Sequence, residues 1–304
     1  MSETLHVNLL FESRMVTVTD VRCRPHEACC GGEEFSDSHE IVFPRSGLFV
    51  RKVGREETAA DANSVLFFRR NQSYRVSHPI VGGDDCTTLS FAGETLLEAF
   101  ATYDPNAYDC PDDPFPALST LNGTKATLMV HHLRSLLLGK TSATCSLDAL
   151  SADEHALRLL DVVAFDAAQF LGRRVGQVRE STRRAHRALA FEARVFLSER
   201  MRESQTLPDI ARAVHSSPFH LARVFRRTTG LSLHKYLTRL RLREALQRLA
   251  GGESDLTRLA HSVGFSSHSH FSQAFRGEFN CPPGECRDLL ASHRRNKTST
   301  NLTA

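Results

Sequence analysis

The stretch between residues 207 and 290 contains one helix, turn, helix pattern twice, and this repeat constrains the fold of the 304-residue chain more than any other feature. The first copy has its apolar and capping residues at Ile210, Ala211, Val214, Ser217, Leu221 and Phe225, and the second at Leu259, Ala260, Val263, Ser267, Phe271 and Phe275. The offset is 49 positions before the turn and 50 after it, so the second turn is one residue longer. Apolar residues at helical spacing, with a serine that can cap the next helix, are typical of a helix-turn-helix unit. Two such units predict two helices that can each enter a groove of DNA.

Capping residues mark the ends of the predicted helices. Thr206 and Asp209 form a capping box before the first helix. Ser217 precedes a proline, which costs nothing at the first helical position because an N–H there would have no helical partner. Gly230 and Asn280 tolerate the left-handed backbone conformation that often ends a helix, so they predict where the second helix of each unit stops.

A strong helical pattern over residues 232–249 joins the two units. Its apolar positions are Leu233, Tyr236, Leu237, Leu240, Leu242, Leu246 and Leu249. At helical rise this segment spans about 27 Å, so it can set the two reading helices about one DNA turn, roughly 34 Å, apart. Both helices could then enter successive major grooves on one face of the duplex.

These segments resemble the DNA-binding domain of AraC/XylS-type transcriptional regulators. The residues that carry the resemblance are Ile210-Ala211, Gly230-Leu231-Ser232, Tyr236, Arg241-Leu242, Ala245, Val263-Gly264-Phe265, Phe271, Phe275-Arg276, Phe279 and Pro282-Pro283. The resemblance covers the chain from near His186 to Leu290. It implies a regulator without catalytic activity, with double-stranded DNA as a partner and RNA polymerase as a second one.

The charge is divided unevenly along the chain, although the net charge is only +3. From residue 181 onward there are 21 Lys and Arg against 10 Asp and Glu, while residues 1–180 hold 17 against 25. A basic segment attracts phosphate and supplies the salt-dependent part of DNA affinity. The basic half is the half that contains the repeat, so we expect the acidic half to stay away from DNA.

The first 92 residues have the pattern of a small antiparallel β domain. Short runs rich in β-branched and aromatic residues occur at 5–11, 15–18, 41–43, 47–51, 64–68, 73–76 and 86–91, separated by Gly, Pro, Asn and Asp. This spacing predicts a barrel or jelly roll, and it resembles the cupin-like sensor domain of the same family. Phe35, Ser36 and Tyr74 stand where a metal-binding cupin would have histidines, which argues against a cupin enzyme.

The overall prediction is a two-domain α+β protein. Apolar stripes at helical spacing over 117–138 and 150–170 predict helices that either pack on the barrel or pair across a two-fold axis, and the resemblance favours a homodimer. The predicted parts are a sensor domain over 1–116, a helical dimerisation segment over 117–171, a linker over 172–184, an all-α DNA-binding domain over 185–292 with its first helix at 185–201, and a tail over 293–304.

The first reading helix offers cationic and small side chains to DNA. Between the apolar residues of its buried face, the outward candidates are Phe219, His220, Ala222, Arg223, Arg226 and Arg227. Arginine suits a bidentate hydrogen bond to guanine, and a small apolar residue such as Ala222 can contact a thymine methyl group. Aligned with the family, Phe219, Ala222 and Arg223 face the bases, while Arg226 and Arg227 are expected at phosphates. A single arginine taken alone could equally be a solvated helix residue.

The second reading helix has fewer cations. Its outward candidates are His268, Ser269, His270, Ser272 and Gln273. Glutamine can read adenine through its amide, while His and Ser can reach bases or backbone. We therefore expect this helix to contribute less affinity and looser specificity.

Cysteines and histidines are unusually frequent in the first half. We selected His39, His78, Cys86 and Cys30 as candidate metal ligands, because imidazole and thiolate suit zinc or another borderline metal. No CxxC or HxH pair supports the site. Two alternatives remain open: buried thiols with a packing role, and a thiol redox switch.

The leading hypothesis is a sequence-specific DNA-binding transcriptional regulator, controlled by a small molecule, metal or oxidant that binds the N-terminal domain. The alternatives are a cupin-type metalloenzyme, or a cysteine-based DNA repair protein, fused to a DNA-binding domain. The N-terminus lacks a signal-peptide pattern and no apolar run approaches the roughly 18 residues of a membrane span, which predicts a cytoplasmic protein with reduced thiols and no membrane partner.

Overall fold

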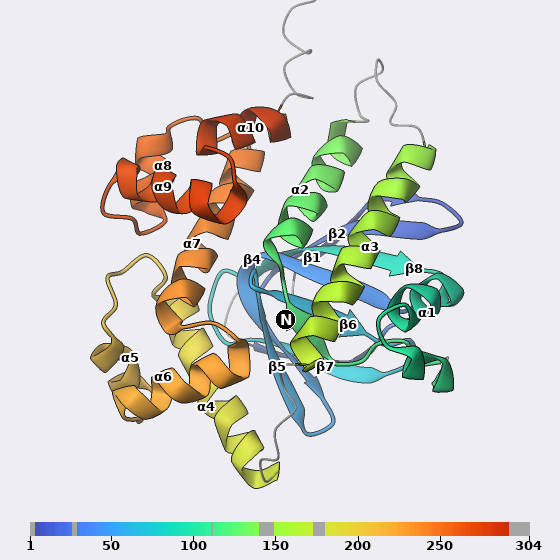
Figure 1. Cartoon of the computed structure of the whole chain (residues 1–304), viewed down its shortest axis with the longest axis horizontal. Coiled ribbons are helices and arrows are strands. Elements are labelled where there is room, and N and C mark those ends of the chain that lie inside the picture. The colour runs from blue at the N-terminus through green and yellow to red at the C-terminus, as the bar shows by residue number, and fades with distance from the viewer. Residues whose placement is uncertain (1–3, 26–28, 111, 140–148, 173–179, 292–304) are drawn as a thin grey trace, which may run out of the picture.

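The computed structural model describes residues 4–25, 29–110, 112–139, 149–172 and 180–291. An antiparallel sheet with helices against it forms the N-terminal part, and a bundle of short helices forms the C-terminal part beside it (Figure 1). This arrangement confirms the predicted two-domain α+β class. Residues 173–179 of the predicted linker and the predicted tail 293–304 lie outside the described residues.

The described strands form one 9-stranded sheet in the order β1-β2-β8-β4-β6-β9, with β5 paired to β4 and β7 paired to β3 and β4. Their bounds are β1 Thr4–Glu12, β2 Val16–Arg24, β3 Cys29–Phe35, β4 Glu40–Val53, β5 Glu56–Asp61, β6 Ser64–Phe68, β7 Ser73–His78, β8 Asp84–Phe91 and β9 Ser119–Leu121. Within the described residues no strand pair joins β1 to β9, so the predicted barrel is corrected to an open sheet. The long strand β4 pairs with β8 and β6 in its first half and with β5 and β7 in its second, which bends the sheet around β4.

Helices close one face of the sheet. They are α1 Gly93–Ala101, a 3-10 turn Pro105–Asp109, α2 Thr124–Gly139 and α3 Ala149–Gly172. The sheet side chains of Val18, Phe67 and Leu89 form one core with Val130 of α2 and Leu160 of α3. Both predicted apolar stripes therefore bury their inner faces within the chain.

The C-terminal helices follow the predicted repeat. Their bounds are α4 Glu180–Glu199, α5 Leu207–Ala213, α6 Pro218–Thr229, α7 Leu233–Ala250, α8 Leu256–Ser262, α9 His268–Phe279 and α10 Pro283–Ala291. The side chains of Thr206, Ser217 and Ser267 accept hydrogen bonds from backbone N–H groups two or three residues into α5, α6 and α9. Gly230 and Asn280 end α6 and α9 with φ of 77° and 58°, which confirms the predicted caps.

Helix α7 belongs to both helix-turn-helix units. Its first half, including Tyr236 and Leu240, lies in the core of α4, α5 and α6. Its second half, including Leu242 and Leu249, lies in the core of α8, α9 and α10. One continuous helix therefore fixes the two units relative to each other.

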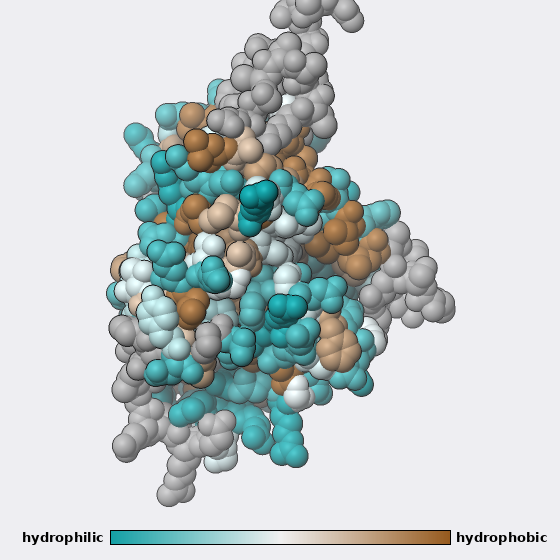
Figure 2. All heavy atoms as spheres, turned by 90° about the vertical axis from the view of Figure 1, so that its right-hand side faces the viewer, coloured by the Kyte–Doolittle hydropathy of each residue, from teal (hydrophilic) through white to brown (hydrophobic). Residues whose placement is uncertain are grey.

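Across the described residues, no helix is both long and apolar enough to cross a bilayer. On the face that carries α1, hydrophobic atoms gather in separate patches among hydrophilic ones (Figure 2).

Candidate nucleic-acid interface

Helix α6 presents its predicted DNA-reading side chains to solvent. Leu221, Val224 and Phe225 are completely buried and hold the helix on the domain. On the opposite face Phe219 is 80% exposed, and Arg223, Arg226 and Arg227 are also exposed. His220 and Ala222 are half-buried at the border between the two faces. The helix thus has one packing face and one cationic face.

The three arginines of α6 carry uncompensated positive charge. Among the described residues, no carboxylate forms an ion pair with Arg223, Arg226 or Arg227, although most other arginines of this domain do pair. The imidazole of His186 in α4 lies 6.0 Å from that of His220. Partial burial lowers the pKa of His186, and the neighbouring Arg227, His220 and Arg223 lower it further.

Helix α9 exposes a mostly neutral face. His268, Ser269, His270 and Gln273 are exposed, and Ser272 is half-buried. The Nε2 atom of His268 lies 3.3 Å from the Ser272 hydroxyl, and the ring of His270 stands edge-on to Phe265. The imidazoles therefore have contacts within the domain, and only Arg276, in the last turn, adds a cation to this helix.

The joining helix α7 is buried against the N-terminal domain. Asp61, at the end of β5, is completely buried, and its Oδ2 atom accepts a hydrogen bond from Arg194 of α4 at 3.1 Å and another from the hydroxyl of Tyr236. The Arg194 guanidinium also donates to the Ser64 hydroxyl at 2.7 Å. The nearby Asp61 carboxylate raises the pKa of Arg194 despite burial, so Arg194 is charged at neutral pH.

Arg243 forms a second contact between the domains, about two turns beyond Tyr236 along α7. Its guanidinium donates to the Ala62 carbonyl and to Asn63 Oδ1, both at 2.6 Å, and to the Asn122 carbonyl. Burial lowers the pKa of Arg243 to about 9, which leaves it charged at pH 7. We call the contacts of Asp61 and Arg243 with the opposite domain the interdomain clamp.

A polar cleft lies between the two domains beside the interdomain clamp. Its volume is about 660 Å³, and its walls include Arg24, Arg45, Gly83, Ser198, Glu203 and Glu244. Arg45 and Ser198 line the cleft, and their Nε and Oγ atoms are buried without a hydrogen-bond partner in the described structure. The cleft therefore offers donors and acceptors to a molecule that enters it.

The candidate metal ligands are only partly brought together. His78 and Cys86 both contact Asp84: the His78 Nε2 atom lies 2.6 Å from Oδ1, and the Cys86 thiol donates to Oδ2 at 3.1 Å. His39 is not in this group, and its Nδ1 accepts from the Arg70 N–H at 3.3 Å. Cys30 lies in β3, and its side chain is outside what the structure describes.

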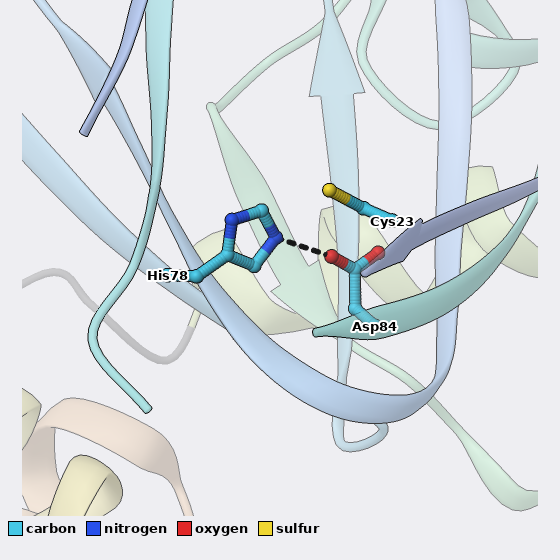
Figure 3. A group of neighbouring side chains, drawn as sticks. All are labelled: Cys23, His78 and Asp84. Atoms are coloured by element: carbon cyan, nitrogen blue, oxygen red, sulfur yellow. Dashed lines mark hydrogen bonds and ion pairs between the residues drawn. The ribbon is translucent and has the colours of Figure 1, made fainter. Parts of the chain in front are cut away.

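Two residues outside the four selected candidates complete the group. Cys23 of β2 and Asp84 of β8 are direct cross-strand partners, and each is buried. With His78 they gather three potential ligand atoms (Figure 3). Only the pairing register of β2 and β8 brings them together, and we see no signal in the sequence that would have given that register.

Comparisons with known proteins agree with the helical arrangement. A family model described as a helix-turn-helix domain matches residues 210–288. The HTH-type transcriptional activator RhaS of Pectobacterium atrosepticum is 42% identical over 282 residues, covering 91% of this chain and 94% of that protein. RhaS of Pectobacterium carotovorum subsp. carotovorum is 27% identical over 285 residues, again covering 91% and 94%. A solved structure of a transcriptional regulator from Chromobacterium violaceum, described as AraC-type, is 32% identical, covers 35% of this chain and 96% of its own, and has a TM-score of 0.33.

The similarity extends over both domains, because the relative at 42% identity is matched over 91% of this chain. The chain therefore belongs to the AraC/XylS family of DNA-binding transcriptional regulators.

Proposed function

We propose that this regulator reads DNA with α6 and α9, and that a polar molecule bound in the interdomain cleft controls how these helices are presented. The observation that carries the proposal is the burial of α7, which fixes both units, against the N-terminal domain through Asp61 and Arg243. A ligand that favours one arrangement of the domains over another would shift the population of DNA-binding-competent molecules. A regulator that binds chromosomal DNA acts in the cytoplasm, and we propose that location for this protein. We also propose that it is not an enzyme.

In this proposal the two reading helices have different roles. Arg223 contacts base edges, because it is exposed in the first half of α6 with no acidic partner among the described residues. Arg226 and Arg227, in the last turn, hold phosphates, and Phe219, His220 and Ala222 complete the contact with the major groove. Helix α9 reads the neighbouring groove with less positive charge, through His268, Ser269, His270, Ser272 and Gln273.

Arg223→Ala is expected to lose discrimination at one or two base pairs of the operator. Removing a bidentate contact to guanine costs about 1–3 kcal/mol at the contacted base pair and little elsewhere. Binding of the wild type and the variant to a library of operator sequences would measure this. Operators can first be selected from random DNA with the full-length protein.

Two further variants serve as controls for Arg223→Ala. Arg226→Ala should weaken binding to all sequences and reduce its salt dependence, as expected for a phosphate contact. Arg212→Ala should change neither the affinity for DNA nor its salt dependence, because Arg212 lies on α5 and pairs with Asp209. If Arg223→Ala weakened all sequences equally, Arg223 would be reassigned to the phosphates.

The cleft favours an effector with several hydroxyl or carboxylate groups. Its walls carry arginines from both domains and glutamates from the C-terminal domain, so a ligand needs both donors and acceptors to satisfy them. The buried Arg45 Nε and Ser198 Oγ atoms have no partner in the described structure and would gain one. Because Arg45 belongs to the N-terminal domain and Ser198 to α4, such a ligand would bridge the domains.

Ser198→Phe is expected to abolish effector binding. The phenyl ring would occupy the cleft, whereas Ser198→Ala removes only a hydroxyl that makes no hydrogen bond in the described structure. Thermal unfolding of the full-length protein with a panel of sugars and sugar acids would identify ligands that raise the melting temperature. A ligand whose effect survives in Ser198→Phe would bind elsewhere and would contradict the cleft assignment.

We also propose that the regulator is a homodimer with α2 and α3 at its two-fold axis. A groove of about 360 Å³ between the outer faces of these helices is lined by Met129, Leu157 and Val162, with Lys125 and Asp161 at its sides. Opposite charges around an apolar centre suit a self-complementary interface. Sedimentation equilibrium would test this, and a single chain at micromolar concentration would contradict it.

A further inference from the structure

We propose that Cys23, His78 and Asp84 form a binding site for a divalent cation of the zinc class in the N-terminal domain. The ligand atoms that these side chains offer all lie within 4.8 Å of one another (Figure 3). All three residues are buried, with exposures of 6%, 1% and 5%. A thiolate, an imidazole and a carboxylate together are a donor set typical of zinc.

The fold brings these residues together through a strand register and a tight turn. Cys23 and Asp84 are directly opposite each other in the β2–β8 ladder, so their side chains share one face of the sheet. His78 ends β7, and a short turn returns the chain to Asp84. Gly83 in this turn has φ of 69°, and a Cβ atom there would lie 1.9 Å from the Cys23 carbonyl oxygen. The turn can therefore approach β2 only with glycine at this position.

The charges around Asp84 differ from those around its neighbour. The Asp85 carboxylate accepts from Arg22 at 2.9 Å and from Arg24 at 2.8 Å. Within the described part of the chain, the Asp84 carboxylate has no Arg or Lys partner, and its contacts are His78 and the Cys86 thiol. A buried carboxylate is costly without a compensating cation. A divalent ion would balance Asp84 and a Cys23 thiolate together.

Small side-chain movements would create the coordination geometry. Ligand atoms on a tetrahedral zinc ion lie roughly 3.5 Å apart, given zinc–ligand distances of about 2.0–2.3 Å. The distance of 2.6 Å between His78 Nε2 and Asp84 Oδ1 would lengthen towards this value of roughly 3.5 Å, and the Cys23 sulfur would move closer to both atoms. On binding, the Cys23 thiol would release its proton to solvent, and His78 would coordinate the cation through Nε2, with the ring proton on Nδ1. Cys86 would orient the carboxylate from the side opposite the metal.

The position of this site connects it with the interdomain cleft. Arg24 follows Cys23 in the chain and Gly83 precedes Asp84, and both line the cleft. A bound cation would hold these two segments of cleft wall in one arrangement. The metal proposal stands on the side-chain geometry alone and does not depend on how the protein reads DNA.

Cobalt titration of the full-length protein, after removal of metal by a chelator, tests the site. We expect one Co²⁺ per chain with a thiolate-to-cobalt charge-transfer band, displaced by Zn²⁺. Cys23→Ser should abolish the band, and His78→Gln should weaken binding at least tenfold. Cys110→Ser, which removes an exposed thiol, and His39→Gln, which removes a histidine outside the group, should keep both the band and the affinity.

Zinc-dependent thermal stability provides a second readout that does not depend on the cobalt absorption band. Zn²⁺ should raise the melting temperature of the wild type and of both control variants, but not that of Cys23→Ser, whose fold can be checked by circular dichroism without metal. Folded wild-type protein that binds no Co²⁺ or Zn²⁺ at micromolar concentration would overturn the proposal. A charge-transfer band that survives in Cys23→Ser would also overturn it, because other thiols would then hold the metal.

Discussion

Arg243→Met should lower the free energy of unfolding by about 3 kcal/mol and separate the unfolding of the two domains. Methionine has a similar length but donates no hydrogen bonds. Asn63 Oδ1 would lose its donor in a buried position, and the Ala62 and Asn122 carbonyls would each lose a charged donor and keep only a longer hydrogen bond, from Asn122 Nδ2 at 3.2 Å and from Arg239 at 3.4 Å. Each unsatisfied buried acceptor costs about 1–3 kcal/mol, and relief of the buried charge offsets only part of this loss.

Urea and thermal unfolding, each followed by two probes, would measure the Arg243→Met effect. The wild type should unfold in one transition, because the interdomain clamp couples the domains, while the variant should show two. Arg212→Ala is the matched control, since its pair with Asp209 is exposed to solvent and should contribute little to stability. A single transition with a loss below about 0.5 kcal/mol in Arg243→Met would mean that other contacts hold the domains together.

The C-terminal domain could be predicted closely because its signals are local. The caps at Thr206, Ser217, Gly230 and Asn280 lie within a few residues of the groups that they satisfy, and all are confirmed. The first helix of this domain, predicted at 185–201, begins earlier, since α4 spans Glu180–Glu199. Such small differences are expected where a helix begins without a capping signal.

The N-terminal domain was predicted less completely because strand pairing is not local. The strands β3, β5 and β9 and the helix α1 were not predicted. The strand β3 contains two glycines and two glutamates, and β5 contains two glutamates and two alanines, so neither has the composition typical of a strand. The predicted helix over 117–138 begins only at Thr124, since residues 119–121 pair with β6 instead.

The interdomain clamp could not be predicted at all. Its hydrogen bonds join residues far apart in the sequence, with separations of 175 between Asp61 and Tyr236 and 181 between Ala62 and Arg243. Tyr236, Arg239 and Arg243 lie at intervals of three and four along α7, so they share one face of the helix. Tyr236 was expected at a buried position, but Arg239 and Arg243 are of a residue type that is mostly exposed, and only the structure places them against the other domain.

The metal candidates show the same limit. The sequence interpretation grouped His39 with His78, but His39 lies beside one end of the β4–β8 ladder, whereas Asp84, the partner of His78, lies at the other end. Glu40, next to His39, pairs with Ser90, whereas Gly47 pairs with Asp84, seven residues along β4. At strand rise this separates the two ends by about 23 Å. The proposed site at Cys23, His78 and Asp84 therefore cannot include His39.

Acidification from pH 7 to pH 5 is expected to destabilise the protein by about 2 kcal/mol through His131 alone. His131 of α2 is completely enclosed, and burial together with Arg45, Arg134 and Arg243 lowers its pKa from 6.5 to about 3. The folded state therefore keeps this imidazole neutral, while the unfolded chain binds a proton below pH 6.5. The stability that His131 contributes is fully present above pH 6.5 and is lost as the pH falls towards 3.

The difference between the wild type and His131→Gln would isolate this contribution. Glutamine does not titrate, so the difference in unfolding free energy should shift by about 2 kcal/mol in favour of the variant between pH 7 and pH 5. Unfolding should be measured with a chelator present, so that proton-linked metal binding at the proposed site does not add to the pH dependence of the unfolding free energy. If the unfolding free energies of the two proteins changed in parallel with pH, His131 would be able to gain a proton inside the folded domain. The arginines that surround it, one of them from the clamp, would then be less tightly packed around it than the structure places them.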